Sequence, residues 1–475
     1  MHISIIFVPI LNIYNKQMKK LSLLSIAALI SGAAFAEGYQ VNLLSAKQAG
    51  MGHVGVAMKL GAESMHFNPA GMAFMEGTAD FSVGISGIMA EATYKNGDYK
   101  HSTDNDISTP MYAYAGFRIY DNLKAGFAVT TPYGSGLNWG KEWAGASLVQ
   151  DISMKAFCFQ PTLSWKITDR LSVGAGAMLY KGNFSLSRAV LPAGALNSAA
   201  AFIPILPPAL GTELKDFIAK YGDVNLLSAT LSGKSKVRAG FNVGAMFDIN
   251  DKVTLGASYR SKVGMKVKAG TAELTYANET ELKNLLTQLN GILQAAGKDP
   301  IVIPPLDEGT FSAELPLPAN LTVGVSYKPT SKLQLAFDLQ TVFWSAYENL
   351  DVQFTENVLG GYSINAVKNY KNTVIARVGG DYALTDRFDL RAGVYFDQSP
   401  IRSSNYNPET PGMNKIGTSV GFSFRPFTGF SIDFSALYIA GLSRDGSYPI
   451  SADKTFSGHY STTAFAPTLG LSYAF

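Results

Sequence analysis

From Thr78 to the C-terminus, the chain alternates between large apolar residues and small or polar ones. A period of two is typical of β-strands, whose successive side chains point to opposite faces of a sheet. The intervening positions are rich in Gly, Ser and Ala, whereas the water-facing side of a soluble β-sandwich more often carries Lys and Glu. The pattern therefore favours a membrane barrel with lipid outside. The last stretch shows it most clearly, with Phe465, Pro467, Leu469, Leu471, Tyr473 and Phe475 on one face.

Short polar turns alternate with longer segments, and together they predict the number of strands. Asp, Asn, Pro and Gly favour turns because they tolerate or pre-set the required backbone angles. Thirteen connections join fourteen strands, so the sequence predicts an all-β fold, a transmembrane barrel of 14 antiparallel strands over 78–475. Both termini are then expected at the rim with the short turns. The short turns are 120–122, 168–170, 250–252, 329–332, 385–387 and 426–429, and the longer segments are about 94–107, 132–150, 188–228, 271–308, 356–371, 398–412 and 441–460.

Residues 37–77 precede the barrel and carry neither a clear strand pattern nor a long helical one. The segment is rich in Gly and Ala, is interrupted by Pro69, and is too short to be an independent domain. We expect it to fold inside the barrel lumen as a plug, or hatch. Its last part contains Phe67, Asn68, Pro69, Ala70 and Gly71.

Residues 1–36 have the features of a signal peptide. Met18-Lys19-Lys20 is a basic start, with Met18 the expected initiator, 21–30 is apolar, and Ala34-Phe35-Ala36 is a cleavage site. About ten apolar residues are too few for an anchor that crosses ~30 Å of hydrocarbon. The removed segment carries three lysines and no acid, so the formal net charge falls from +3 to zero. This balance excludes a nucleic-acid partner or a polybasic membrane segment.

The composition agrees with a membrane barrel. Charged residues make up only 16% of the chain, against roughly 25% in soluble domains. Gly (46), Phe (28) and Tyr (23) are plentiful, although a large secreted β-sandwich array would show similar values. The single cysteine, Cys158, excludes an intramolecular disulfide and is expected to be a packed strand residue.

Two of the longer segments have helical periodicity. Residues 212–221 and 281–293 each place Leu, Phe or Ile side chains on one face. An apolar stretch, 201–210, precedes the first. Either these segments cover one another as an outer cap, or they form an apolar groove for a hydrophobic ligand from outside. The ligand-binding candidates are Phe202, Ile203, Ile205, Leu206, Leu210, Phe217 and Ile218.

Enzyme signatures are absent from the sequence. It contains no HExxH and no paired-Cys metal spacing. His66, close to Asn68, is more often structural than catalytic at such a position. We therefore expect no catalytic residue, metal site or cofactor. A barrel enzyme that acts on lipids stays as a minor alternative.

Several motifs in order resemble those of the FadL-type outer-membrane channels for long-chain fatty acids and other hydrophobic compounds. Phe67-Asn68-Pro69-Ala70-Gly71-Met72 is similar to the Asn-Pro-Ala-containing hatch of that family. The stretch 390–400, Leu-Arg-Ala-Gly-Val-Tyr-Phe-Asp-Gln-Ser-Pro, is the closest local match. Further matches are 169–176, 315–325 and 343–345.

The resemblance implies a monomeric outer-membrane channel that takes up long-chain fatty acids or related hydrophobic compounds. Ligand is captured at outer loops, enters an apolar pocket and is released sideways into the membrane beside a kinked strand. We expect that kink at Pro132, where the third strand (124–131) ends. Arg188 and Arg238, beside the large outer loop, are candidates for binding a carboxylate.

The resemblance also turns the plug into a candidate gate. We expect Asn68-Pro69-Ala70 to be its fixed corner, and the mobile gate to be Glu37, Gly38, Tyr39, Gln40, Val41 and Asn42. The terminal Phe475 is similar to the signal that the barrel-assembly machinery reads, so this machinery and outer-membrane lipid are expected partners. A non-specific porin or a surface barrel that transports nothing remain the alternatives.

Overall fold

A computed structural model describes residues 39–475, except 196, 198–199, 201–202, 205, 296, 298–299, 301, 304, 359–360, 362 and 452–453. The expected signal peptide, 1–36, and the first two residues of the expected gate, Glu37 and Gly38, lie outside the described residues.

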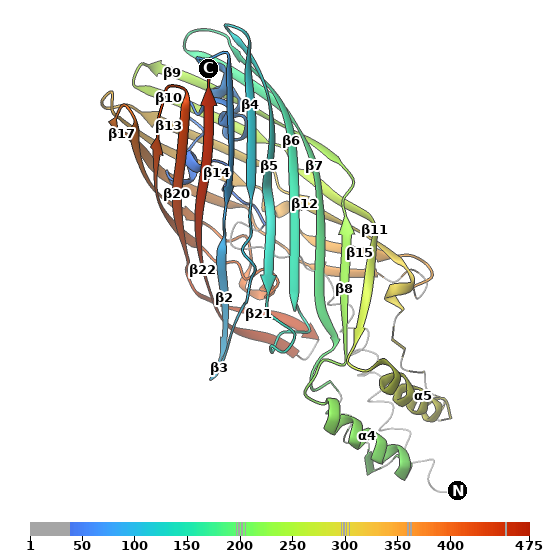
Figure 1. Ribbon diagram of the computed structural model, residues 1–475. Helices are drawn as coiled ribbons and strands as arrows, with labels where there is room; N and C mark the ends of the chain where they lie inside the picture. Colours follow the sequence, from blue (N-terminus) through green and yellow to red (C-terminus); the bar gives the residue numbers. More distant parts are fainter. Residues whose placement is uncertain are drawn as a thin grey trace.

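Across the described residues, the strand pieces join into a closed barrel of 14 antiparallel strands, as predicted (Figure 1). Closure follows because β1 pairs with both β4 and β22. In chain order the strands are β1 (Ala79–Ser86) with β2 (Met89–Asn96); β3 (Tyr99–Ser102) with β4 (Met111–Tyr120); β5 (Leu123–Asn138); β6 (Asp151–Lys166); β7 (Leu171–Leu191); β8 (Leu227–Lys234) with β9 (Arg238–Asn250); β10 (Val253–Arg260) with β11 (Val263–Tyr276); β12 (Thr310–Leu317) with β13 (Asn320–Tyr327); β14 (Leu333–Val342) with β15 (Asn349–Phe354); β16 (Ser363–Val367) with β17 (Thr373–Thr385); β18 (Phe388–Asp397); β19 (Lys415–Phe424); β20 (Phe430–Gly441) with β21 (Arg444–Ser451); and β22 (Lys454–Ala474).

The alternation along the strands separates the lipid face from the lumen. In β22, Phe465, Leu469 and Leu471 are exposed on the outer surface, while Ala466 and Thr468 are buried. Large apolar side chains therefore face outward and small or polar ones face inward, which is the arrangement that lipid outside the barrel requires. The six expected short turns connect β4 to β5, β6 to β7, β9 to β10, β13 to β14, β17 to β18 and β19 to β20.

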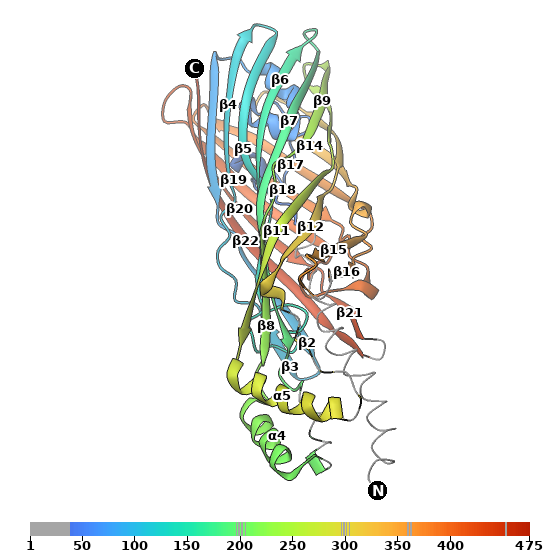
Figure 2. The same cartoon turned by 90° about the vertical axis from the view of Figure 1, so that its right-hand side faces the viewer.

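Residues 39–77 form short helical turns inside the barrel, near the rim with the short turns (Figures 1 and 2). These turns are α2 (Ala46–Ala49), η1 (Gly61–Glu63), α3 (Ser64–Phe67) and η2 (Pro69–Phe74). Glycines in the wall allow the close approach of this segment. A Cβ on Gly244 would lie 2.0 Å from the Asn68 Oδ1 atom, so no larger residue fits there without a shift. We call residues 39–77 the plug.

At the opposite end, α4 (Pro208–Tyr221) and α5 (Glu279–Ala295) lie side by side beyond the strands (Figures 1 and 2). They contain the two predicted helices, 212–221 and 281–293. The remaining short turns are η4 (Leu306–Glu308), η5 (Trp344–Ala346) and η6 (Ser403–Asn405). Within the described ranges, no helix is both long and apolar enough to cross a membrane.

The expectation that the third strand ends at Thr131-Pro132 is wrong, because β5 continues to Asn138. The register with β6 shifts between Thr130 and Tyr133, and this irregularity accommodates Pro132, which has no N–H to donate. Hydrogen bonding to β6 then resumes from Tyr133 to Asn138.

Candidate functional site

The wall of the barrel is interrupted beside β5. β4 pairs with β5 only as far as Tyr112 and Thr130. The chain before β4 turns away instead and bridges to the β1–β2 side, where Ser108 pairs with Ile88. From Thr131 onward, the edge of β5 that β4 would have covered is therefore without a wall strand.

The first described residues of the plug cover this edge. Val41 N–H donates to the Pro132 carbonyl at 2.8 Å, and Gly134 N–H donates to the Tyr39 carbonyl at 2.9 Å. Gln40 and Tyr133 form the corresponding β-bridge. Two open backbone groups of β5, the Pro132 carbonyl and the Gly134 N–H, are thus paired by the plug, which satisfies part of an otherwise unpaired strand edge.

Tyr39 anchors this end of the plug to the far wall. Its side chain is 1% exposed, and its hydroxyl donates to the Pro316 carbonyl of β12. Its ring meets Trp344 edge-on, with the centroids 5.1 Å apart. Such contacts between aromatic rings add to the free energy gained by burial.

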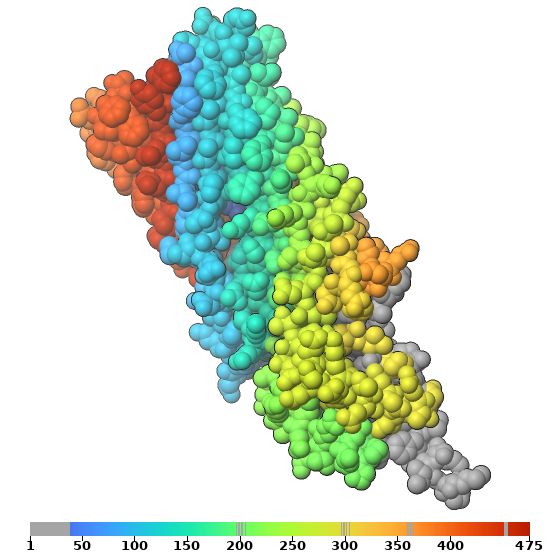
Figure 3. Space-filling model, turned by 45° about the vertical axis from the view of Figure 1, so that its right-hand side comes forward, coloured from blue at the N-terminus to red at the C-terminus, as the bar shows by residue number. Residues whose placement is uncertain are grey.

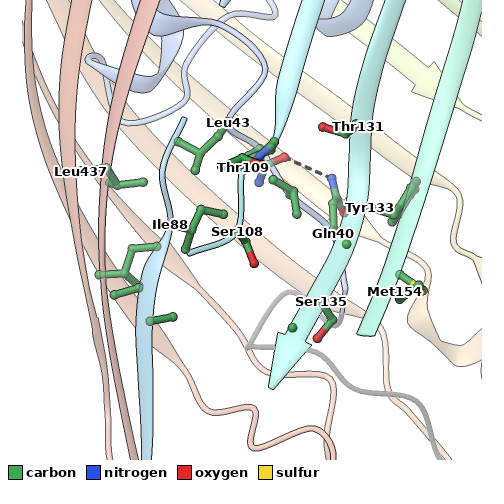
Figure 4. Close-up of a pocket in the computed structure, with 18 of the residues that line it drawn as sticks. Gln40, Leu43, Ile88, Ser108, Thr109, Thr131, Tyr133, Ser135, Met154 and Leu437 are labelled. Carbon is green, nitrogen blue, oxygen red and sulfur yellow. Dashed lines mark hydrogen bonds between the residues drawn. The ribbon is translucent and has the colours of Figure 1, made fainter. Parts of the chain in front are cut away.

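A cavity of about 220 Å³, here called the main cavity, lies between the plug and the interrupted wall (Figure 4). Inward-facing residues such as Tyr133, Leu437 and Ile439 line the cavity. Lys155 and Phe157 line it as well, and because they alternate with the buried residues of β6, they belong to the outer face of that strand. A cavity lined by both faces of the wall passes through the wall. In the space-filling view, a hollow lies between the blue and teal strands, with the darker blue of the plug behind it (Figure 3).

The lining of the main cavity suits an apolar solute. Val41, Leu43, Ile88, Met154 and Leu437 supply aliphatic surface. The polar lining residues are mostly uncharged, and Gln40 Nε2 donates to Asn42 Oδ1 at 3.3 Å. Four charged residues, Asp106, Lys155, Asp397 and Lys415, also line the cavity. Among the described residues, no group of His, Cys, Asp or Glu is arranged to hold a metal ion.

Asn68 lies toward the other end of the plug and is hydrogen-bonded to the wall. It is fully buried, and its Nδ2 donates to the carbonyls of Val56 at 2.7 Å and Ala245 at 3.0 Å. Its Oδ1 accepts from Ala70 N–H at 3.1 Å, which caps the turn that begins at Pro69. These bonds tie two parts of the plug to each other and to β9. Phe67 packs beside His66, and Gly71 lies against Ser64.

A second anchor was not anticipated from the sequence. Asp338 of β14 accepts from the N–H groups of Gly55 and Val56 at 2.7 and 3.0 Å. Lys47 lies 3.6 Å from Glu63 and 3.7 Å from Asp433 of β20. The signal for such anchors is a lone charged residue at an inward position of an otherwise small or apolar strand face.

The two plug histidines are buried and uncharged at neutral pH. Burial, with a smaller contribution from Arg377, lowers the pKa of His53 to about 3. Burial and the nearby Arg260 likewise lower the pKa of His66 well below its ordinary value. The Arg260 guanidinium donates to the His66 carbonyl at 3.0 Å. Neutral, enclosed imidazoles of this kind serve packing rather than proton transfer.

A buried ionic cluster lies nearer the outer end. Arg188 and Glu409 form an ion pair with both side chains fully buried, and Lys368 lies 3.3 Å from the second oxygen of Glu409. Burial lowers the pKa of Lys368 to about 8. Within the described residues, Arg188 Nε and Nη1 have no hydrogen-bond partner. Lys368 and Glu409 were missed from the sequence because the three residues come together only through the fold.

Arg238, the other predicted cation, does not join this cluster. It is exposed, and its Nε donates to the Gly264 carbonyl at 3.1 Å. Phe475 lies at the opposite rim, where its ring stacks on Phe81 at 6.1 Å and its N–H donates to the Ala79 carbonyl.

The predicted outer-loop residues bury their apolar side chains against one another. Leu210 and Phe217 of α4 pack with Leu282 and Leu285 of α5, and Ile203, Leu206 and Ile218 border this cluster. Lys220 and Glu281 link the two helices at 2.7 Å. Two further candidates, Phe202 and Ile205, lie outside the described residues.

Comparisons with known proteins agree with this architecture. A family model described as outer membrane protein transport protein (OMPP1/FadL/TodX) matches residues 27–475. A 47 kDa outer membrane protein of Pasteurella multocida is 24% identical, over 88% of this chain and 91% of its own. A long-chain fatty acid transport protein of Salmonella typhi is 22% identical, over 88% and 90%.

Solved structures share the fold. A Pseudomonas aeruginosa FadL homologue superposes with a TM-score of 0.73 at 20% identity, over 92% of this chain and all of its own. The Pseudomonas putida toluene transporter TodX superposes with a TM-score of 0.65 at 17% identity, over 91% and 98%. The chain therefore belongs to the OMPP1/FadL/TodX family and is a non-enzymatic channel for hydrophobic compounds in the bacterial outer membrane.

Proposed function

We propose that the channel takes up long-chain fatty acids or closely related hydrophobic compounds, that the start of the plug is its gate, and that the ligand leaves sideways through the interrupted wall. The main cavity carries this proposal, because plug residues such as Val41 and outward-facing wall residues such as Phe157 line the same space. A ligand held there touches both the gate and the membrane side of the wall.

Sideways release fits the chemistry of such ligands. Exposing a methylene group to water costs ~0.8 kcal/mol, so a chain of about fourteen methylenes resists entry into a water-filled passage by on the order of 11 kcal/mol. An exit into lipid avoids this cost. A plugged lumen meanwhile keeps polar solutes out.

The gate is held by contacts that a ligand can replace. Two backbone hydrogen bonds join Tyr39 and Val41 to β5, and each contributes only about 1 kcal/mol net. Binding in the main cavity competes directly with the side chains of Val41 and Leu43. The corner at Asn68 has buried hydrogen bonds to the wall and stays in place while residues 39–42 move.

The buried cluster favours a carboxylate over an uncharged hydrocarbon. Arg188 and Lys368 outnumber Glu409, so the cluster carries a net charge of +1. Two nitrogens of Arg188, Nε and Nη1, have no hydrogen-bond partner among the described residues. A single carboxylate would neutralise it. In this conformation Glu409 holds the position next to Arg188, so a fatty acid headgroup has to displace or share it. Capture begins at the apolar cap of α4 and α5.

A reversible cross-link over the interrupted wall tests the exit. A Cβ on Gly136 would lie 3.3 Å from the Ser108 hydroxyl, close enough for a disulfide between cysteines at the two positions. The double variant Ser108→Cys, Gly136→Cys should lose fatty acid uptake when oxidised and regain it with reductant. Each single variant is the control. Full uptake by the oxidised protein would show that ligand leaves elsewhere.

Two alternatives are tested with the wild-type protein. Rapid entry of sugars into protein-containing liposomes would identify a non-specific porin. Mass spectrometry of the purified protein should find bound fatty acid or a related lipid. A surface barrel that transports nothing should hold no such ligand and should show no uptake.

A further inference from the structure

Six outward-facing lysines form a patch on one side of the barrel. Lys155 on β6 and Lys181 on β7 are exposed, and each alternates with buried residues of its strand. Lys234, Lys236, Lys266 and Lys268 continue the series on β8, just beyond it, and on β11. We call these six residues the basic patch. The four strands lie side by side (Figures 1 and 3).

The strand register makes the basic patch continuous. Lys155 pairs with Asn183, which in turn pairs with Lys234, and Lys181 pairs with Phe157. Toward β11, Lys236 N–H donates to the Lys266 carbonyl at 3.0 Å. Neighbouring strands are ~4.8 Å apart, so Lys155 and Lys234 are about 10 Å apart across the sheet. An anionic group of ordinary size can therefore touch several of these lysines at once.

The basic patch lies where the apolar surface ends. Toward the short-turn rim, the outer face of β6 and β7 carries Phe159, Leu163, Trp165 and Leu179. Beyond the patch, outward positions are polar, as at Ser153 and Ser185. Ten residues separate Trp165 from Lys155, which in a tilted strand corresponds to roughly 25 Å along the membrane normal, the height of a barrel's apolar band. The patch is thus at the outer boundary between lipid and water.

The charge of the basic patch is nearly uncompensated by the protein. Among the described residues, the one carboxylate within 4 Å of these lysines is Glu314, 3.9 Å from Lys266. Six lysines and one glutamate give a net charge of +5. On another part of the wall, the outer face of β15 presents Asp351 and Gln353 instead. The outer face of β15 therefore differs in charge from the basic patch.

We propose that the basic patch binds the phosphorylated headgroup of an outer-leaflet lipid. Its phosphates lie among the lysines, which bind phosphate as point charges, and its acyl chains lie on Phe157, Phe159 and Leu179 below them. The apolar surface continuous with the charges favours a lipid over a soluble anion. Since Lys155 also borders the main cavity, the bound lipid sits beside the interrupted wall. The inference holds whatever the barrel transports.

The test compares two sets of substitutions in the detergent-purified full-length protein. The patch variant carries Lys155→Gln, Lys181→Gln, Lys234→Gln and Lys236→Gln. The control carries Lys95→Gln, Lys100→Gln, Lys215→Gln and Lys332→Gln, which are equally exposed and lie elsewhere. Native mass spectrometry measures retention of lipid A with two phosphates and of the same lipid without phosphate. The patch variant should retain at least about tenfold less of the phosphorylated lipid, the control should match wild type, and the dephosphorylated lipid should be retained poorly by all.

Three outcomes would overturn the proposal. One is equal retention by the patch variant and the control. Another is equal retention of the two lipids by the wild type. The third is complete displacement of the lipid by millimolar inorganic phosphate, which would mean that the lysines bind phosphate alone. A matching set of Lys→Arg substitutions keeps the charge and should keep the lipid, which separates loss of charge from damage to the barrel.

Discussion

The Tyr39 hydroxyl donates to the carbonyl of Pro316, a residue 277 positions later in the chain. This bond spans from the first described residue of the plug to β12, and the backbone of the same tyrosine pairs with β5. One residue therefore joins the strand edge at the interrupted wall to the far side of the lumen. Any movement that opens the wall at β5 has to release Tyr39 as well.

Deletion of residues 37–42 should reduce fatty acid uptake at least about tenfold while the barrel still assembles. Of the deleted residues that the structure describes, Gln40, Val41 and Asn42 line the main cavity, and none belongs to a wall strand. Uptake of a radiolabelled fatty acid measures the first effect, and heat-modifiable mobility on a gel measures the second. The conservative variant Tyr39→Phe keeps the ring beside Trp344 and should retain most of the uptake. Unchanged uptake after the deletion would mean that these residues are not the gate.

Substitution of Asn68 by Ala should loosen the corner of the plug. The change removes two donated hydrogen bonds and one accepted bond at a fully buried position, a loss of about 2–4 kcal/mol. Hydrogen exchange of residues 54–72 should become faster, whereas the strands should keep their protection. Asn122→Ala, in an exposed turn, is the control. If exchange in this segment is as slow as in wild type, Asn68 is not the fixed corner.

Acidification should weaken the seating of the plug. The pKa of His53 is about 3 when buried and ~6.5 when exposed, so between these values the released plug binds a proton that the seated plug does not. The seated plug has its full stability above pH 6.5. Below this pH, the free energy that favours the seated plug falls by ~1.4 kcal/mol per pH unit, so it is about 2 kcal/mol lower at pH 5. The protection factors of residues 46–56, which relate the observed rate of hydrogen exchange to the intrinsic rate at the same pH, should therefore be lower at pH 5 than at pH 7.5.

His53→Gln should reduce this pH dependence, and the double variant His53→Gln, His66→Gln should remove most of it, because the pKa of His66 is lowered in the same direction. Equal protection of the plug at both pH values in the wild type would contradict this account.

The strand count was readable from the sequence because its signals are local. A period of two and turns such as Thr168-Asp169-Arg170 depend only on near neighbours. The path of β5 could not be predicted from the sequence. Whether a strand ends at Pro132 or continues to Asn138 depends on which segments pair with its two edges. Here β6 pairs with one edge and the plug with the other.

The candidate site was only partly predictable for a related reason. Arg188 stood out as a cation beside an apolar loop, but its partner Glu409 is 221 residues away in the chain. Arg238 had the same local signal and proved to be exposed. Burial and pairing of a charge depend on the closed barrel, and no local pattern reports them.

The Arg188 cluster gives a prediction with a built-in control. Arg188→Gln should weaken binding of a long-chain fatty acid at least about tenfold and leave binding of the matching fatty alcohol unchanged, because only the acid carries a charge for the cluster to neutralise. Glu409→Gln should strengthen fatty acid binding, since it removes the internal competitor for Arg188. Arg238→Gln, at the exposed arginine, should have no effect. Equal losses for acid and alcohol would indicate damage to packing instead.

Substitution of the terminal aromatic should impair assembly. Phe475 pairs with the start of β1 through its backbone, and its ring is exposed beside Phe81, where a binding partner can reach it. Phe475→Ser should therefore lower the amount of folded barrel in outer-membrane fractions several-fold, while the backbone pairing that closes the barrel is kept. Phe427→Ser removes an equally exposed aromatic from a turn at the same rim and should assemble normally. If Phe475→Ser also assembles normally in cells, the terminal residue is not the assembly signal. If both variants fail, loss of aromatic surface at this rim is the cause, and the position at the C-terminus has no special role.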